Sequence, residues 1–231
     1  MPRIVKEPDQ RRTEILNAAQ GLLYTKGYEQ MSIQDILDQV HISKGAFYHY
    51  FDSKQALLDA LIGRMQVDAE QVIGPISADP SLPALEKMQR VFATAARWKL
   101  AQKEYLMALL RVWYADDNAI VRQKIQARLL LESGHFITDV IEQGVREGVF
   151  QTGYPERVGE IAMGLVTTLG DHYAEILLAN PPPPDGLEQI LRINAAYTEA
   201  IERVLGAPPG SLELIDVASI KAWLDTPGSG A

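Results

Sequence analysis

The sequence predicts an all-α fold in which a small N-terminal three-helix domain precedes a larger helical domain. Apolar residues recur at the spacings of three and four that place them on one face of a helix, and no convincing run alternates as a strand would. Gly27, Gly148 and Gly206 directly follow predicted helices, where the left-handed conformation that ends a helix favours glycine. We expect the N-terminal domain at residues 1–54 and the C-terminal domain at 55–226, with a linking helix at 54–73.

The composition is that of an ordinary globular protein. Of the 231 residues, 47% are hydrophobic and 23% are charged, so a sizeable core can be buried. The absence of cysteine excludes disulfide bonds and thiol chemistry, and it fits a reducing compartment. The first residues lack the apolar segment of a signal peptide, and no stretch approaches the ~18 consecutive apolar residues that span a bilayer. We therefore expect a soluble, cytoplasmic protein without a membrane partner.

The net charge of −8 argues at first against a nucleic-acid partner, but the charge is unevenly distributed. Residues 1–54 hold seven basic and seven acidic residues, so the whole acidic excess lies in the rest of the chain. Four of the basic residues fall within the first twelve positions. They form either an arm along a phosphate backbone or a solvated tail, and composition alone favours the tail. Charge is therefore weak support for DNA binding.

The first helix is expected at about residues 9–26. Its apolar stripe consists of Ile15, Ala18, Ala19, Leu22 and Leu23. A short second helix follows Ser32, because Ser32 and Asp35 have the spacing of a capping box.

A tight connection at residues 41–43 leads to the third helix, from Lys44 to about Phe51, which Ser43 can cap. The fourth helix follows Ser53 and ends at Gly74-Pro75. Further helices are expected at about residues 82–101, 103–115, 118–147, 155–179, 185–205 and 211–224.

Residues 32–51 satisfy the requirements of a helix-turn-helix unit. Such a unit needs a short supporting helix, a tight turn, and a second helix with an apolar face and a small polar face. Phe47 and Phe51 supply the apolar face of the second helix. In this unit the first helix lies against the DNA backbone, and the second enters the major groove, which is ~12 Å wide and admits one helix.

This segment also resembles a known family. The pattern consists of Ile15-Leu16-x-Ala18-Ala19, Leu22-Leu23, Gly27-Tyr28, Ser32-Ile33-x-x-Ile36, Val40-His41-Ile42-Ser43-Lys44-Gly45-Ala46-Phe47-Tyr48-His49-Tyr50-Phe51 and Ser53-Lys54-x-x-Leu57. Over residues 11–62 it is similar to the N-terminal domain of the TetR family of one-component transcriptional regulators. The later pattern Gly144-x-x-x-Gly148-x-Phe150 is a weaker resemblance.

The resemblance implies a fully helical homodimer. Its N-terminal domains are expected to bind a palindromic double-stranded DNA operator, and its C-terminal domain to bind an unidentified small-molecule effector that weakens DNA binding. Repression is the default that the resemblance implies, and no cofactor or catalytic residue is expected. The candidate DNA-binding residues are Ser32, Ser43, Lys44, Gly45, Ala46, Tyr48, His49 and Lys54.

These candidates also have purely structural interpretations. Lys44 reaches a base edge or a phosphate, or it is a solvated lysine. Tyr48 donates its hydroxyl to a phosphate, as this position often does in the family that the chain resembles, whereas contact with DNA and with solvent are equally plausible for His49. Ser32 and Lys54 stand at helix N-termini, which favour a phosphate, although capping is the first role of Ser32. The small residues after Lys44 let the backbone approach the groove or simply pack locally.

The C-terminal domain carries less information. Aromatic and apolar residues on its middle helices suit a ligand pocket, although plain core packing explains them as well. The candidates are Trp98, Tyr105, Met107, Trp113, Phe136, Met163, His172 and Tyr173, of which Trp98 and Tyr105 are preferred. The last two long helices are expected to pair with those of a second copy through Ile161, Leu165, Leu169, Ile193 and Tyr197, which the core of a single copy would also suit.

Two rival interpretations remain less favoured. A helical enzyme needs convergent titratable groups, and the spacings of His135 with Asp139 and of His172 with Glu175 also occur by chance. We therefore expect no metal site. An adaptor bundle without DNA binding is the other rival, and the neutral N-terminal part gives it some support.

Overall fold

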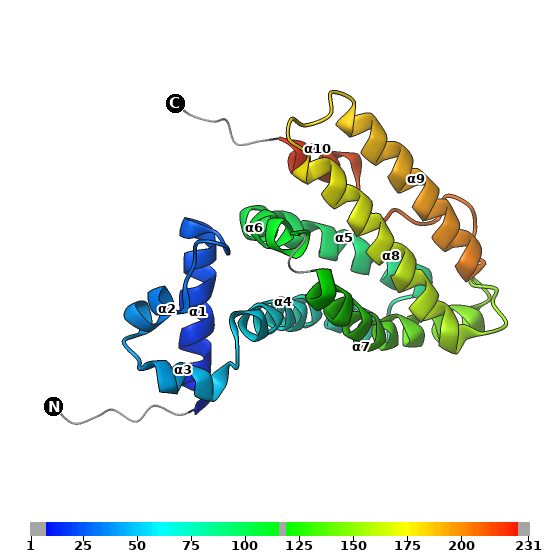
Figure 1. Ribbon diagram of the computed structural model, residues 1–231. Coiled ribbons are helices and arrows are strands. Elements are labelled where there is room, and N and C mark those ends of the chain that lie inside the picture. Colours follow the sequence, from blue (N-terminus) through cyan, green and yellow to red (C-terminus); the bar gives the residue numbers. More distant parts are fainter. Residues whose placement is uncertain (1–7, 116–118, 226–231) are drawn as a thin grey trace. The chain divides into compact units, whose positions relative to one another are not determined.

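The computed structural model describes residues 8–115 and 119–225, except for most side chains between positions 120 and 136 (Figure 1). These residues form ten α-helices and no strand, which confirms the predicted all-α fold. They divide into two compact units. Unit 1 contains the described residues of Met1–Asp68 and Glu104–Arg122, and unit 2 those of Ala69–Lys103 and Gln123–Ala231. Among the described helices, none combines the length and the apolar character needed to cross a membrane.

Unit 1 anchors three short helical segments to one longer helix. It contains α1 (Pro8–Lys26), α2 (Ile33–Val40), α3 (Lys44–Tyr50), the first part of α4 (Lys54–Ser77) and nearly all of α6 (Lys103–Trp113). The predicted apolar stripe of α1 is buried, with no member more than 9% exposed. Ile36 of α2, Phe47 of α3 and Leu57 of α4 are each 0% exposed. Because α2 packs against both α1 and α3, these side chains set the direction in which α3 presents its outer face.

Unit 2 contains the longer helices. They are the end of α4, α5 (Ala84–Ala101), most of α7 (Ala119–Glu147), α8 (Pro155–Leu178), α9 (Gly186–Leu205) and α10 (Val217–Leu224). Its α8 and α9 lie side by side (Figure 1). The main core includes Met88, Ile141, Phe150, Ile201 and Leu205. A second cluster forms where α10 packs against α9, from Ile176, Ile190 and Ile220.

Two close approaches join the ends of α7 and α9. A Cβ atom added at Gly144 would lie 2.1 Å from the ring of Phe150, which is itself 1% exposed. The backbone N–H of Gln151 donates to the carbonyl of Leu205 at 3.0 Å. A Cβ atom added at Gly206 would lie 2.2 Å from the carbonyl oxygen of Gln151, and Gly206 has a φ of +62°. These contacts leave no room for a side chain at Gly144 or Gly206.

Two helix boundaries differ from the predicted ones. Helix α4 continues past Pro75 to Ser77, because a proline in the last turn removes only one helical hydrogen bond, and the Ser77 hydroxyl donates to the Gly74 carbonyl at 2.9 Å. Helix α10 begins at Val217, six residues later than predicted. The reason is Glu202, which is 5% exposed and whose carboxylate accepts the backbone N–H groups of Gly210 and Leu212 at 2.9 and 2.8 Å.

Candidate DNA-binding surface

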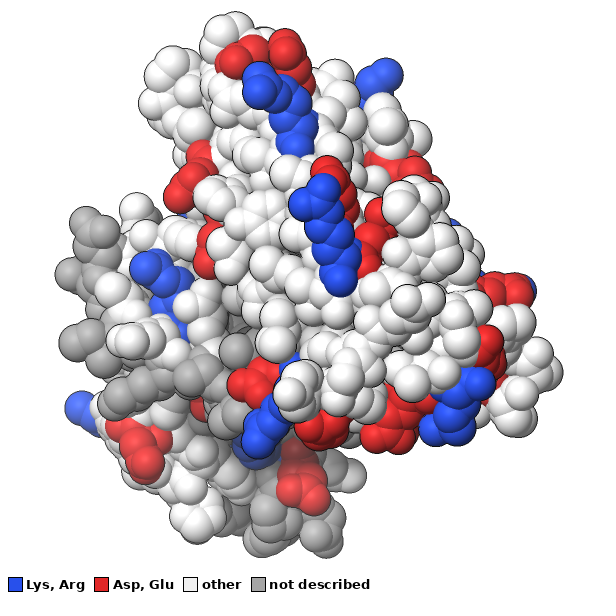
Figure 2. Space-filling view, turned by 90° about the vertical axis from the view of Figure 1, so that its right-hand side faces the viewer, with Lys and Arg blue, Asp and Glu red and all other residues white. Residues whose placement is uncertain are grey.

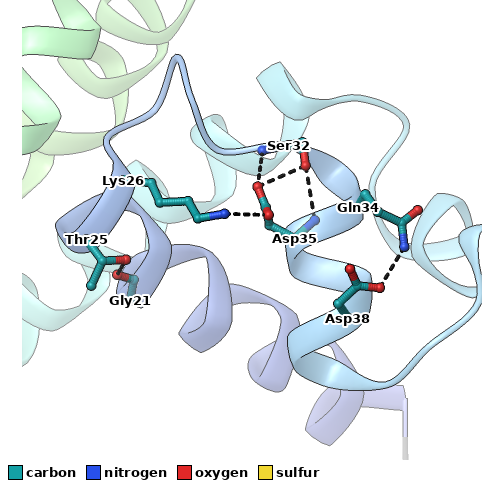
Figure 3. A network of polar contacts seen from close by, with 7 residues as sticks. All are labelled: Gly21, Thr25, Lys26, Ser32, Gln34, Asp35 and Asp38. Atoms are coloured by element: carbon teal, nitrogen blue, oxygen red, sulfur yellow. Dashed lines mark hydrogen bonds and ion pairs between the residues drawn. The ribbon is translucent and has the colours of Figure 1, made fainter.

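The N-terminus of α2 is fixed by a reciprocal cap (Figure 3). The backbone N–H of Asp35 donates to the Ser32 hydroxyl oxygen at 3.1 Å, and the backbone N–H of Ser32 donates to the Asp35 carboxylate at 2.9 Å. Lys26 of α1 also donates to this carboxylate at 2.6 Å. The hydrogen bond from Lys26, and then those from Ser32, lower the pKa of Asp35 from 3.8 to about 2. The cap therefore ties the start of α2 to the end of α1.

The turn between α2 and α3 contains a strained residue. His41 adopts the left-handed conformation with a φ of 55°, which non-glycine residues rarely adopt. Its backbone N–H and that of Ile42 both donate to the Leu37 carbonyl, the latter at 3.1 Å. Ser43 then caps α3 by accepting the backbone N–H of Ala46 at 3.2 Å. The turn is thus held by backbone bonds and a side-chain cap within ten residues.

Helix α3 has a buried face and an exposed face. Phe47 is 0% exposed and Phe51, which follows the helix, is 3% exposed, so both lie in the core as predicted. Lys44, Gly45, Tyr48 and His49 are exposed, and Tyr48 keeps 41% of its surface accessible.

Aromatic contacts support the exposed face. The ring of Tyr48 stands edge-on to that of Phe47 with 5.5 Å between centroids, and the Lys44 ammonium lies 6.0 Å from the Tyr48 ring centroid. This face presents a cation and a phenol hydroxyl on a helix whose other side is anchored.

The candidates outside α3 are already engaged within the chain. The Ser32 hydroxyl both accepts from Asp35 and donates to it, at 3.1 and 2.9 Å. The ammonium of Lys54 lies 4.1 Å from the ring centroid of Tyr28 and donates to the Glu29 carbonyl at 3.4 Å. Burial lowers the pKa of Lys54. A phosphate contact by Ser32 or Lys54 would have to share these groups with their present partners.

Two residues absent from the predicted set help to build this surface. Lys26 pairs with Asp35, and the guanidinium of Arg12 lies 5.2 Å from the ring centroid of Phe51. Both contacts join residues that are nine or more positions apart. Only the basic character of Arg12 and Lys26 was visible in the sequence, and it did not indicate these partners.

The candidate ligand residues divide between the two units. Tyr105 and Trp113 lie on α6 in unit 1, whereas Trp98 on α5 and His172 on α8 lie in unit 2. Tyr105 is 3% exposed, and its ring centroid lies 5.5 Å from that of Tyr24 of α1. The side chain of Phe136 lies outside the described residues.

The candidate dimer residues differ in exposure. Ile161 is 52% exposed, whereas Leu169 is 5% exposed and belongs to the core of unit 2. Leu165, Ile193 and Tyr197 are partly buried against that same core.

The histidine and carboxylate pairs have few partners. His172 Nδ1 lies 3.6 Å from the Glu175 carboxylate, and both side chains are exposed. His135 lies outside the described side chains, so its pairing with Asp139 stays a question of sequence. Within the described part of the chain, no group of three or more histidine, cysteine or acidic residues is arranged to hold a metal ion.

Comparisons with known proteins point to one family. The model described as "Bacterial regulatory proteins, tetR family" matches residues 15–61. The HTH-type transcriptional regulator EthR of Mycolicibacterium smegmatis is 31% identical over 130 residues, covering 49% of this chain and 60% of that protein. The HTH-type transcriptional repressor KstR2 of Mycobacterium tuberculosis is 27% identical over 161 residues, covering 65% and 74%.

The curated relatives are matched over only part of their length, from 26% to 74% of each of the first three. Among solved structures, the SmeT–triclosan complex covers 88% of this chain and 94% of the other, with a TM-score of 0.60 and 17% identity. At this identity the likeness shows a shared fold.

Proposed function

Because this chain belongs to the TetR family of bacterial regulatory proteins, we propose that it is a transcriptional repressor that binds a palindromic operator as a homodimer. The family consists of regulators rather than enzymes, and its members bind operator DNA and small-molecule ligands. The observation that carries the proposal is the two-sided α3. Its inner side is anchored by Phe47 and Phe51, and its outer side is exposed and polar. A cytoplasmic location follows from access to an operator.

The outer face of α3 enters the major groove in this proposal. Lys44 supplies a cation to a base edge or a phosphate, and Tyr48 donates its hydroxyl to a phosphate. The small residues Gly45 and Ala46 let the backbone approach, and His49 faces the duplex from the following turn. Since the caps at Ser32 and Ser43 fix the helix before DNA arrives, little ordering entropy is lost on binding.

Dimerisation is proposed to use the outer faces of α8 and α9. Figure 2 views the side on which these helices lie in Figure 1, and broad uncharged areas there separate a few mixed charges. Ile161 of α8 is an exposed apolar anchor on this side of the chain. Leu169 packs in the core of unit 2, so we assign the interface to Ile161 and Leu165 with Tyr197 rather than to Leu169. An Ile161→Asp variant should shift the sedimentation equilibrium toward monomer without unfolding the chain.

Release from DNA is proposed to follow the binding of an apolar small molecule. SmeT is described in complex with triclosan, a ligand of that kind, and the candidates Trp98, Tyr105, Trp113 and His172 are mostly aromatic. A ligand that prefers the conformation with the wrong spacing between the two α3 helices draws the population away from DNA. Helix α4 contributes residues to both units, so it is the element through which we expect this change to pass.

A band-shift assay with the intergenic DNA upstream of the gene tests the proposal. We expect retardation that weakens steeply with salt, because phosphate contacts release counterions. Tyr48→Ala should weaken binding to operator and random DNA alike, and Lys44→Ala should also relax the sequence preference. Tyr154→Ala is a matched control, since Tyr154 is a 71% exposed tyrosine in unit 2. Equal binding by all three variants would remove α3 from the interface.

A further inference from the structure

A polar joint inside unit 1 connects α1, α4 and α6. Arg64 of α4 directs its guanidinium at two amide side chains of α1. One nitrogen donates to the Asn17 side-chain carbonyl at 2.8 Å, and the other donates to that of Gln20. Because α1 carries the packing surface of α2, this fork fastens the base of the DNA-reading segment to α4.

The third element of the joint is a buried tyrosine on α6. Tyr105 is 3% exposed, and its hydroxyl has no hydrogen-bond partner in the described part of the chain. An unsatisfied buried hydroxyl is destabilising, and in native structures it often marks a strained or functional position. Its ring packs against Tyr24 of α1 at 5.5 Å between centroids, so the same tyrosine also touches the helix that Arg64 holds.

Arg64 is near enough to Tyr105 to be its alternative partner. Burial raises the pKa of the Tyr105 hydroxyl, and the guanidinium of Arg64 acts in the opposite direction. A guanidinium has five donors in a fixed fork, and a tyrosine hydroxyl can accept one of them. Satisfying Tyr105 would draw the fork from α1, whereas keeping both amides leaves the hydroxyl bare. The joint therefore has two mutually exclusive hydrogen-bonding arrangements.

We propose that Arg64 is a positioning residue for DNA binding that exchanges between the α1 amides and the Tyr105 hydroxyl, so that a shift of α6 loosens α1. The proposal rests on the proposed DNA-binding function only for its consequence, since the exchange itself is a property of unit 1. In the arrangement described here the fork is on α1 and the reading segment is held. A small movement of Tyr105 toward Arg64 favours the other arrangement.

The absence of cysteine in the chain allows a test that needs no DNA. Spin labels are attached to Thr13→Cys on α1 and Val67→Cys on α4, which are both exposed, and their distance distribution is measured. With Arg64 intact we expect one narrow distribution. Arg64→Met should broaden it or add a second distance, because both bonds to α1 are lost. Arg111→Met is the matched control, since it removes an exposed arginine from α6 and should leave the distribution unchanged.

The exchange is tested by a double-mutant cycle in upstream-DNA affinity. Arg64→Met should weaken binding by at least about fivefold, the lower end of typical coupling between sites. Tyr105→Phe removes the competing acceptor and keeps the ring, so binding should be unchanged or tighter. In the Arg64→Met background, Tyr105→Phe should have no further effect on affinity, since the two residues act together.

Each outcome decides between the arrangements. A narrow distribution in Arg64→Met would overturn the joint, and an equal Tyr105→Phe effect with or without Arg64 would overturn the exchange. If Arg64→Met fails to fold, Arg64→Lys keeps the charge but loses the fork, and it should show a smaller broadening. If wild-type protein does not bind DNA at all, the proposed function fails, while the distance measurement still decides the joint.

Discussion

The segment from α2 to α3 and the junction at the ends of α7 and α9 are held in different ways. In the first, the fixing bonds join near neighbours: Ser32 with Asp35, and Ser43 with Ala46. In the second, the contacts join distant residues, such as Gln151 with Leu205, and Gln89 with the Ser211 carbonyl at 2.6 Å. The difference teaches that a DNA-reading surface is shaped locally, whereas the body that carries it depends on long-range packing.

The largest expected effect concerns the distant contacts. Gly144→Ala places a Cβ atom 2.1 Å from the buried ring of Phe150, so the ring or the backbone must shift. Overpacking of this kind costs about 1–3 kcal/mol, and we expect the upper part of that range in the free energy of unfolding by urea.

Gly63→Ala is the control for that substitution. Nothing lies within 4 Å of the added Cβ atom at this position on α4, so the gain in helix propensity should stabilise the chain by roughly 0.5–1 kcal/mol. If both alanine variants had the same stability, the close approach to Phe150 would not constrain unit 2.

The next effect concerns the local cap. Ser32→Ala removes the acceptor for the Asp35 backbone N–H at the start of α2, and loss of such a cap costs about 1 kcal/mol in unfolding free energy. Ser211→Ala is the matched control in unit 2, because the Ser211 hydroxyl is buried without a hydrogen-bond partner among the described residues. Its removal should be close to neutral. A costlier change at Ser211 than at Ser32 would reverse the comparison between the two regions.

A smaller effect is expected from pH. The pKa of Asp35 is lowered in the folded chain from 3.8 to about 2, so its ionised form stabilises the fold above pH 4. This contribution is lost as the pH falls from about 4 toward 2, since the folded carboxyl finally takes up its proton there. Asp35→Asn should flatten the unfolding free energy over that range, compared with wild type measured by urea titration at each pH. An unchanged pH dependence in the variant would mean that Asp35 does not hold the cap.

The smallest effect is expected at His41. Its left-handed conformation costs a non-glycine residue roughly 1–2 kcal/mol, while glycine loses roughly 0.5–1 kcal/mol more entropy on folding. His41→Gly should therefore raise the unfolding free energy by only about 0.5 kcal/mol. A clear destabilisation would show that the imidazole makes contacts that offset its backbone strain.

The same contrast explains what could be predicted from the sequence. The capping spacing of Ser32 with Asp35 and the positions of Phe47 and Phe51 were readable, because each is a pattern within a single turn or helix. The start of α10 was not, because it depends on the Glu202 carboxylate, which binds the loop before it.

Contacts across the fold were also hidden. The placement of Lys54 over the ring of Tyr28 follows from tertiary packing, and so does that of Tyr105 beside α1 rather than in unit 2. Neither position carries a periodic signal that distinguishes these partners from any other buried or charged neighbour.

The central claim is that the exposed face of α3 binds the duplex. Its most direct test is fluorescence anisotropy of labelled upstream DNA over a series of salt concentrations, with wild-type protein and a Lys44→Ala/Tyr48→Ala variant. We expect the variant to bind more weakly at every salt concentration and to lower the slope of log affinity against log salt by about 1, as loss of one cationic phosphate contact requires. Wild-type affinity and an unchanged slope in the variant would contradict the claim.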